Sequence, residues 1–158
     1  MPIHPQSELV LEDSEPSIRV VLGDDHARTR QRLRSLLDGD DMIEVVAEAR
    51  DLLTVMRDVP AHRPRVLVID LSMSNGSSLD AIRLLRKRVP GTEIVVLTME
   101  ESAVFAQQAL DAGAIGFVIK HAADAELAEG VRNAARGEEY VSPRVAARLA
   151  LRRGLLGT

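Results

Sequence analysis

The sequence predicts an α/β fold in which helices cover both faces of a five-stranded parallel sheet, a doubly wound arrangement. Five short runs rich in Val and Ile carry this prediction, and four of them are nearly continuous, as is typical of strands buried on both faces. Amphipathic segments with short connections separate the runs, and this alternation indicates βαβ units. The predicted strands occupy residues 18–22, 43–49, 65–71, 93–99 and 116–120.

Each predicted strand is followed by a segment with apolar residues at helical spacing. Four of these segments end at glycine or at Pro-Gly, which stop helices. They span residues 27–39, 77–91, 101–113 and 124–137. The second strand is more polar than the others and therefore suits an edge of the sheet. The segment after it, 51–64, has the weakest pattern, and we expect Pro60 to break its helix.

The chain of 158 residues fits one compact domain with short extensions. We expect a flexible acidic tail over residues 1–17, the compact domain over 18–137, and a linker with an extension helix over 138–158. In the extension, Ser142 is the predicted N-cap and Pro143 the first helical residue. Three arginines share one face of this helix, which predicts a solvated surface or, alternatively, a contact with DNA or a dimer partner. They are Arg144, Arg148 and Arg152.

The composition excludes several classes of function. The chain has no cysteine, which rules out disulfides, thiolate metal sites and thiol catalysis and is compatible with the cytoplasm. A net charge of −4 argues against a nucleic-acid-binding chain, and 2% aromatic residues argue against base stacking. No apolar run approaches the roughly 18 residues that span a bilayer, and the N-terminus lacks a secretory signal, so we expect no membrane association. The four histidines show no ligand spacing, so we expect all of them at the surface.

Polar side chains end several of the predicted strands. Asp24 and Asp25 follow the first strand, Asp70 ends the third, Thr98 the fourth and Lys120 the fifth. Because ligands bind outside the carboxyl ends of parallel strands, we expect these side chains to converge at one edge of the sheet. Taken singly, the acids would be ordinary helix caps and the lysine an ordinary solvated residue, so that only the combination indicates a site.

Three carboxylates in one pocket repel one another. A lysine ammonium and a divalent cation would offset this repulsion, and Mg²⁺ prefers carboxylate and carbonyl oxygens as ligands. Asp70 would then stay ionised and act as a nucleophile on phosphorus, with Thr98 as a neutral hydroxyl donor. The pattern therefore predicts transfer of a phosphoryl group to an aspartate.

Four pieces of sequence make this interpretation more specific. "VVLGDD", "VLVIDLSM", "VVLTM" and "GAIGFVIK" occur in this order within residues 18–137. Together they resemble the receiver domain of bacterial two-component response regulators. The stretch "AARGEEYVSPRVAARL" is similar to the segment after the receiver in the NarL/FixJ (LuxR-type) subfamily. The resemblance implies a flavodoxin-like (βα)5 fold with strand order 2-1-3-4-5 and a cytoplasmic location. It also implies a sensor histidine kinase as partner and allows a homodimer.

Site roles follow from this resemblance by position in the motifs. Asp70 corresponds to the phosphoacceptor, and Lys120 to the lysine that contacts the phosphoryl group. Asp25 corresponds to a direct Mg²⁺ ligand, together with Asp70 and the backbone carbonyl of Ser72. Asp24 corresponds to the acid that acts through a metal-bound water. Mn²⁺ is the alternative ion.

The resemblance also implies a conformational switch. Thr98 corresponds to a hydroxyl that moves toward the phosphate, and Phe117 to an aromatic that changes rotamer with it, although a plain core residue is an equal interpretation of Phe117. Phosphorylation would shift an existing equilibrium of the face formed by the receiver's fourth helix, fifth strand and fifth helix. The chain would be a signalling switch rather than a metabolic enzyme, catalysing only its own phosphorylation and dephosphorylation.

The sequence departs from the family pattern near the phosphoacceptor. Ser74 stands where proline is common, and Gly76 still permits a tight turn, so we expect a looser loop rather than a lost site. Met99 stands where a small residue is usual and could shade the phosphoryl pocket. Ser72 and Glu100 occupy the positions that tune dephosphorylation in the family.

Three other functions compete with this interpretation. An aspartyl-phosphate phosphatase of the haloacid-dehalogenase type needs a second Asp two residues after the nucleophile, and Ser72 at that position argues strongly against it. An atypical receiver would bind partners without phosphorylation. A complete transcription factor needs a helix-turn-helix output of roughly 60 residues, but only residues 138–158 follow Gly137. We therefore expect a receiver that is part of a longer protein or acts through protein contacts, and that reaches DNA only through a separate output domain.

Overall fold

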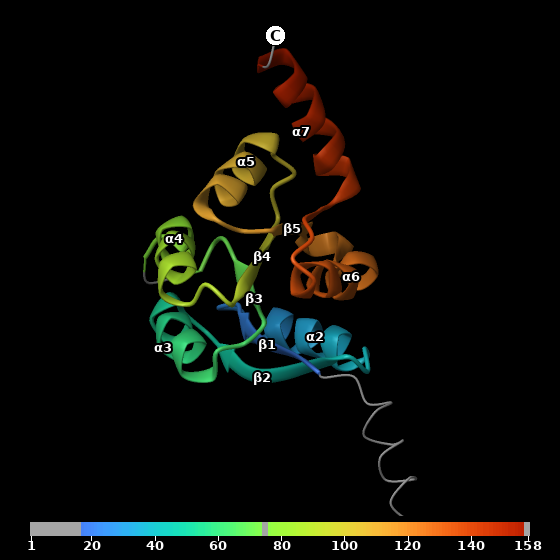
Figure 1. Ribbon diagram of the computed structural model, residues 1–158. Helices are drawn as coiled ribbons and strands as arrows, with labels where there is room; N and C mark the ends of the chain where they lie inside the picture. Colours follow the sequence, from blue (N-terminus) through green and yellow to red (C-terminus); the bar gives the residue numbers. More distant parts are fainter. Residues whose placement is uncertain (1–16, 74–75, 157–158) are drawn as a thin grey trace, which may run out of the picture.

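The computed structural model describes residues 17–73 and 76–156 and has a six-stranded parallel sheet with helices on both faces (Figure 1). The strand order is β2-β1-β3-β4-β5-β6, which confirms the order predicted for the first five strands. These are β1 (Ile18–Gly23), β2 (Ile43–Ala49), β3 (Val66–Asp70), β4 (Glu93–Thr98) and β5 (Gly116–Ile119). Most of the predicted acidic tail, residues 1–16, lies outside the described residues.

Two groups of helices cover the two faces of the sheet (Figure 1). Helices α3, α4 and α5 lie on one face, and α2 and α6 lie on the other. The helices are α2 (Ala27–Asp38), α3 (Leu52–His62), α4 (Ser78–Arg88), α5 (Ala103–Ala112), α6 (Ala123–Ala135) and α7 (Pro143–Leu156), with a 3₁₀ turn η1 (Lys120–Ala122) after β5. In the part of the chain that the structure describes, no helix combines the length and apolar character that crossing a membrane requires.

The inner strands are apolar on both sides, which divides the core into two clusters. In β3, Leu67 and Ile69 belong to the cluster beneath α3, α4 and α5. Val66 and Val68 of the same strand belong to the cluster beneath α2 and α6. All four side chains are completely buried. This two-sided burial explains why the sequence of the strand is continuously apolar rather than alternating.

The expectation that Pro60 breaks the helix after β2 is wrong, because α3 continues to His62. Pro60 lies in the last turn, where its missing N–H removes only one hydrogen bond of the helix. The helix ends at Arg63, which has a left-handed φ of 46° and donates its N–H to Val59 O at 2.8 Å.

A sixth strand, β6 (Tyr140–Val141), corrects the predicted count of five. It pairs in parallel with β5, with Gly116 opposite Tyr140 and Phe117 opposite Val141. Part of the predicted linker therefore belongs to the sheet. The strand has only two residues, too few to produce the alternating pattern by which half-buried strands are predicted.

Ser142 lies between β6 and Pro143, the first residue of α7, where the sequence predicts it. Its hydroxyl accepts the N–H of Ile119 at 3.0 Å and donates to Glu126 Oε1 at 2.6 Å. Its backbone N–H donates to Phe117 O at 2.9 Å. The residue thus fastens the start of α7 to both β5 and α6.

Helix α7 packs beside α5 (Figure 1). Its apolar face buries Val145 and Leu149 in the cluster beneath α3, α4 and α5. Arg144 Nη1 lies 3.3 Å from both carboxylate oxygens of Glu101, and Arg148 Nη1 donates to Glu101 O at 2.7 Å. Two arginines of the predicted stripe therefore contact the loop before α5 in addition to facing solvent.

Candidate functional site

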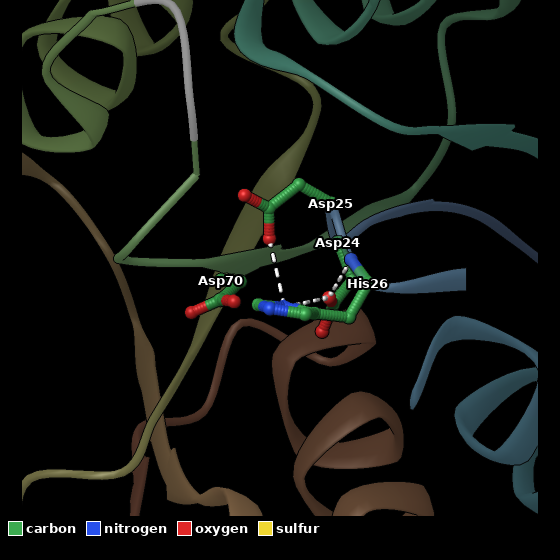
Figure 2. Close-up of side chains that lie close together, drawn as sticks. All are labelled: Asp24, Asp25, His26 and Asp70. Atoms are coloured by element: carbon green, nitrogen blue, oxygen red, sulfur yellow. Dashed lines mark hydrogen bonds and ion pairs between the residues drawn. The ribbon is translucent and has the colours of Figure 1, made fainter. Parts of the chain in front are cut away.

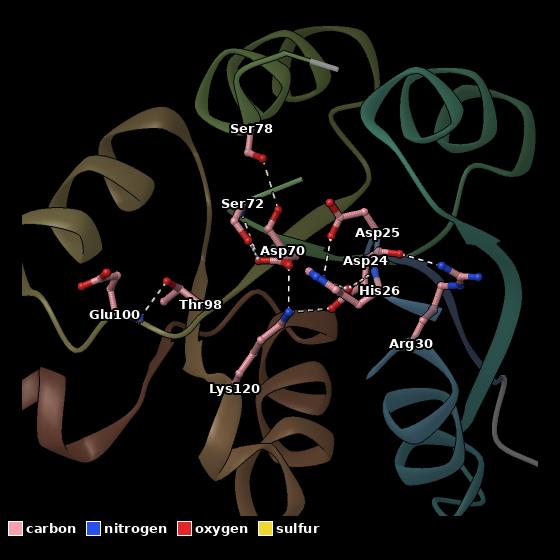
Figure 3. Close-up of polar contacts among 10 residues, drawn as sticks. All are labelled: Asp24, Asp25, His26, Arg30, Asp70, Ser72, Ser78, Thr98, Glu100 and Lys120. Carbon is pink, nitrogen blue, oxygen red and sulfur yellow. Dashed lines mark hydrogen bonds and ion pairs between the residues drawn. The ribbon is translucent and has the colours of Figure 1, made fainter. Parts of the chain in front are cut away.

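The acidic side chains at the ends of β1 and β3 meet at the carboxyl edge of the sheet (Figure 3). The two strands are neighbours, Asp24 follows β1 directly, and Asp70 is the last residue of β3. The exposed fractions of Asp24 and Asp70 are 0% and 1%. One ligand atom from each of Asp24, Asp25, His26 and Asp70 lies within 4.8 Å of the others. The three carboxylates that the sequence analysis singled out are therefore close together.

Gly23 allows the acidic loop after β1 to approach the loop after β3. A Cβ at this position would lie 3.0 Å from Val55 Cγ2 and 3.3 Å from Met73 Sδ. Val55 is a completely buried residue of α3, and Met73 is 4% exposed, so neither has room to move away freely. A larger residue at position 23 would therefore crowd Val55 and Met73 next to the acidic loop.

Lys120 neutralises part of the acidic charge. Its Nζ donates to Asp70 Oδ2 at 2.8 Å and lies 2.9 Å from Asp24 Oδ2. Burial alone would lower the pKa of the Lys120 ammonium, but the close contacts with Asp24 and Asp70 and their negative charges outweigh it, so the pKa is raised above its ordinary value. Lys120 is therefore charged at neutral pH.

Two buried carboxylate oxygens, Asp24 Oδ2 and Asp25 Oδ1, have no hydrogen-bond partner among the described residues. Lys120 approaches the first of them closely, without the alignment of a hydrogen bond. Three carboxylates and one ammonium leave the cluster with an excess of negative charge. A divalent cation would offset this charge, and Asp25 Oδ1 is available to it as a ligand, so the donor set fits a hard ion such as Mg²⁺.

Two serines hold Asp70 in place (Figure 3). The backbone N–H and the hydroxyl of Ser72 both donate to Asp70 Oδ1 at 3.0 Å. The hydroxyl of Ser78 donates to Asp70 O at 3.2 Å. The hydroxyl contact of Ser72 is an addition to the roles predicted for this residue, and its carbonyl as a metal ligand stays a prediction. Ser74 lies outside the described residues, whereas Gly76 has a φ of 126°, which favours glycine.

Thr98 ends β4 at the same edge of the sheet and is 4% exposed. Asp70 pairs with Leu97, so Thr98 lies one residue further along the neighbouring strand. Its Oγ1 accepts the N–H of Glu100 at 3.0 Å. Ser72, Thr98 and Glu100 line a hollow of about 390 Å³ between the first turns of α4 and α5. The switch and tuning roles of these residues stay predictions.

Phe117 and Met99 have opposite environments. Phe117 is completely buried in the core beneath α3, α4 and α5, so it has a core position whether or not it also changes rotamer. Met99 is 67% exposed. It lines a second hollow, of about 310 Å³, together with His26 and Lys120. Met99 therefore shares a hollow with Lys120, and its effect on access to the acidic pocket stays a prediction.

Two residues near the acidic pocket were not assigned to it by sequence reasoning. His26, expected to be a plain surface residue, is 70% exposed, but its Nδ1 lies 3.0 Å from Asp25 Oδ1 (Figure 2). Arg30 donates from Nη1 to Asp24 O at 2.7 Å and from Nε to Glu48 Oε1 at 3.1 Å. Because His26 directly follows the two acids in the sequence, its place near the pocket could have been predicted. No feature of the sequence indicates the position of Arg30.

An acidic pocket with a bridging lysine, at the carboxyl edge of a doubly wound parallel sheet, is the arrangement that the resemblance to receiver domains predicts. The chain belongs to the response regulator receiver domain family, which matches residues 20–132.

The relatives of the chain are transcription-regulating proteins. The chain is 36% identical over 129 residues to the oxygen regulatory protein NreC of Staphylococcus carnosus (strain TM300), covering 81% of this chain and 59% of NreC. It is 36% identical over 132 residues to the DNA-binding transcriptional activator DevR/DosR of Mycobacterium tuberculosis, covering 84% of this chain and 61% of the relative. The chain thus spans about three fifths of the length of these relatives.

Solved structures agree with this assignment. A two-component response regulator of the LuxR family from Aurantimonas sp. SI85-9A1 superposes with a TM-score of 0.83 at 31% identity, covering 87% of this chain and 98% of that one. The isolated REC domain of RcsB from Salmonella enterica serovar Typhimurium, solved in the presence of the phosphomimetic BeF3⁻, gives a TM-score of 0.77 at 26% identity, covering 84% and 98%. The predicted relationship to LuxR-type response regulators is confirmed.

Proposed function

We propose that the chain is the phosphoacceptor receiver of a two-component signalling system, in which Asp70 takes a phosphoryl group from a phosphohistidine of a sensor kinase. One observation carries the proposal. Asp70 is a buried carboxylate whose Oδ1 is held by Ser72 and whose Oδ2 is held by Lys120, beside the acidic pair that follows β1. The membership of the chain in the receiver family supports the same reaction.

In this reaction a carboxylate oxygen of Asp70 forms a bond to phosphorus while the bond between phosphorus and the histidine nitrogen breaks. The leaving nitrogen keeps the electron pair of that bond and takes up a proton from solvent. Lys120, charged at neutral pH, offsets the negative charge on the transferring oxygens. Thr98 would add a neutral hydroxyl donor after it turns toward the phosphoryl group.

The proposed metal ligands are Asp25, Asp70 and the backbone carbonyl of Ser72, with Asp24 acting through a water. Asp25 Oδ1, which has no hydrogen-bond partner among the described residues, supports this assignment. Mg²⁺ held by these residues, or Mn²⁺ in its place, would supply positive charge to offset that of the transferring group. Lys120 then supplies the remaining positive charge from the side of β5.

We assign the output of the switch to helix α7. Phe117 pairs with Val141, and two hydrogen bonds join β5 to Ser142 at the start of α7, one from the Ser142 N–H to Phe117 O and one from the Ile119 N–H to the Ser142 hydroxyl. A displacement of β5 would therefore reach α7 directly. Helix α7 also packs on α5, which belongs to the face that phosphorylation is expected to rearrange. These contacts support α7 as the element that passes a change at Thr98 to a partner.

The proposed partners are a sensor histidine kinase in the cytoplasm and, on the output side, a second copy of the chain. The solved structures that resemble the chain include two RcsB dimers bound to two parallel DNAs, at 26% identity with a TM-score of 0.77. We propose that DNA is reached only through a separate output module, because the net charge of −4 does not favour direct binding.

Intact-mass spectrometry tests the proposal. The protein is incubated with Mg²⁺ and acetyl phosphate or phosphoramidate, and one phosphate adduct is expected. The Asp70→Asn variant should give none, whereas Asp80→Asn, which changes an exposed acid on α4, should keep the adduct. Circular dichroism of both variants shows whether they are folded.

Failure to form an adduct with either small donor and also with a phosphorylated cognate sensor kinase would reject the proposal. It would favour the alternative, an atypical receiver that acts by binding partners without phosphorylation. An adduct that persists in Asp70→Asn would instead mean that a different residue accepts the phosphoryl group.

A further inference from the structure

We infer that His26 is a nitrogen ligand of the metal site and makes this receiver prefer divalent transition-metal ions such as Co²⁺ and Ni²⁺ over Mg²⁺. The inference rests on the proposed function, because the acidic pocket must bind a metal ion for His26 to take part. It adds a ligand to the set that the resemblance implies and changes the class of ion that the site selects.

The positions of the ligand atoms fit a shared ion (Figure 2). Nδ1 of His26 lies 3.0 Å from Asp25 Oδ1 and 3.7 Å from Asp24 Oδ1. Ligand atoms from all four residues of the cluster lie within 4.8 Å of one another. Two ligands that bind one ion at about 2.1 Å and at right angles to each other lie about 3 Å apart. The spacing of Nδ1 and Asp25 Oδ1 therefore equals that of adjacent ligands around one ion.

The contact between His26 and Asp25 is not an ordinary hydrogen bond. Asp25 Oδ1 is buried and has no hydrogen-bond partner among the described residues, although Nδ1 is only 3.0 Å away. The two atoms thus approach each other without the alignment that a donated proton requires. Both atoms therefore remain available to bind one shared ion.

Helix capping does not explain the orientation of the ring either. His26 is the N-cap residue of α2, a position that favours Ser, Thr, Asp or Asn, and its side chain makes no capping hydrogen bond. Its backbone N–H donates to Asp24 Oδ1 at 2.9 Å. That bond holds the backbone of His26 beside Asp24. The ring is 70% exposed and can be replaced without disturbing the core.

The identity of the donor atoms decides the preference. Carboxylate and carbonyl oxygens suit Mg²⁺, whereas an imidazole nitrogen adds affinity for Co²⁺ and Ni²⁺ and adds little for Mg²⁺. Because the site proposed from the resemblance has oxygen ligands only, His26 is the one group in the cluster that can separate the two classes of ion.

Isothermal titration calorimetry with Mg²⁺, Co²⁺ and Ni²⁺ tests the inference on the wild type, His26→Ala and a control, His121→Ala. His121 is also an exposed histidine at this edge and lies 3.7 Å from Glu101 instead of beside the three aspartates. His26→Ala should weaken Co²⁺ and Ni²⁺ binding at least about tenfold, which is the lower limit for losing even an outer partner of a metal site. Its Mg²⁺ affinity should change less than about twofold, and His121→Ala should change none of the three.

An equal loss for all three ions, or unchanged Co²⁺ and Ni²⁺ binding, would overturn the inference. The NMR chemical shift of His26 Nδ1 gives a second readout, because adding Zn²⁺ should change this shift and adding Mg²⁺ should not. Asp25→Asn separates the two proposals. If the Asp25→Asn variant still binds Mg²⁺ like the wild type, the proposed set of metal ligands is wrong. If it loses Mg²⁺ while His26→Ala keeps the wild-type preference, only the role of His26 is wrong.

Discussion

The Nζ atom of Lys120 lies 2.8 Å from Oδ2 of Asp70 and 2.9 Å from Oδ2 of Asp24, so one ammonium bridges two buried carboxylates on neighbouring strands. The side chain of Lys120 is 11% exposed, and those of Asp24 and Asp70 are 0% and 2% exposed. Water therefore screens these charges little, and each carboxylate depends on the lysine for its compensation.

Replacing Lys120 with Met should lower the free energy of unfolding by about 3 kcal/mol at neutral pH without Mg²⁺, since two buried carboxylates lose their counter-charge. The pKa of Lys120 is raised in the folded protein, so its stabilising effect is complete below the ordinary lysine pKa and is lost as pH rises through the raised value. The difference between wild type and variant should therefore shrink above about pH 10.5. Urea unfolding at a series of pH values measures it.

The only other lysine of the chain, Lys87, provides the control because it is exposed on α4. Lys87→Met should change the free energy of unfolding by less than about 0.5 kcal/mol. A Lys120→Met variant as stable as Lys87→Met would show that the bridge contributes nothing to stability.

Replacing Asp25 with Asn should stabilise the metal-free protein by about 1 kcal/mol, because one of three neighbouring negative charges is removed. The same variant should lose most of the stabilisation by Mg²⁺, which in the wild type is about 2.7 kcal/mol at a concentration of 100 Kd. Urea unfolding with and without Mg²⁺ measures both effects. Asp41→Asn, at an exposed position, is the control, and an equal response of both variants to Mg²⁺ would contradict the assignment of Asp25.

Replacing Met99 with Ala should speed autodephosphorylation or phosphorylation by small donors severalfold, because the exposed thioether lies at the hollow beside Lys120. The time course of the phosphate adduct, followed by intact mass, measures both rates. Leu53→Ala removes a similarly exposed apolar side chain from α3 and should leave the rates unchanged. If Met99→Ala also leaves both rates unchanged, the side chain does not control access.

Replacing Ser142 with Ala should destabilise the protein by about 1–3 kcal/mol, because the buried N–H of Ile119 loses its acceptor. Hydrogen exchange at the Ile119 amide should become faster in parallel. Glu139→Ala, in the exposed turn before β6, should have neither effect. An unchanged exchange rate at Ile119 in Ser142→Ala would mean that this bond does not protect β5.

Tyr140 is the only tyrosine, and the chain has no tryptophan, so alkaline absorbance reports on one phenol. Burial, and then the negative charges of Glu126 and Glu129, raise the pKa of Tyr140 to about 12. The phenol should ionise near that value in the native protein and near about pH 10 in denaturant. Because the folded pKa is the higher one, the stabilisation is complete below about pH 10 and is lost above it. If Tyr140 ionises near pH 10 while the circular dichroism spectrum of the folded protein is unchanged, β6 does not pack against β5.

The inner strands and the acidic pocket could be predicted from the sequence because each has one dominant physical cause. Strand β3 lies between two helix layers, so its residues must be apolar on both sides. The run then stops at Asp70, where the chain leaves the core. Since parallel strands end at the same edge, Asp24 and Lys120 could be grouped with Asp70 without a structure.

Other features depend on tertiary contacts that leave no pattern in the sequence. The two residues of β6 become a strand only because α6 returns the chain to the edge of β5. The ring of His26 lies beside Asp25, and Asp24 accepts the backbone N–H of His26, and neither local contact produces a periodic signal in the sequence. The effect of Pro60 was overestimated because its position in the last turn of α3 depends on where the helix ends.

The short strand β6 also determines where this domain can be truncated. Without it, β5 would become an edge strand, and its sequence "GFVI" is fully buried, apolar and free of charge. Such an edge presents unpaired backbone N–H and C=O groups to another chain. A version of the protein that ends at Gly137 would therefore expose one side of β5 even with its acidic pocket intact. Truncations and fusions should keep the chain through α7, so that β6 continues to protect the sheet.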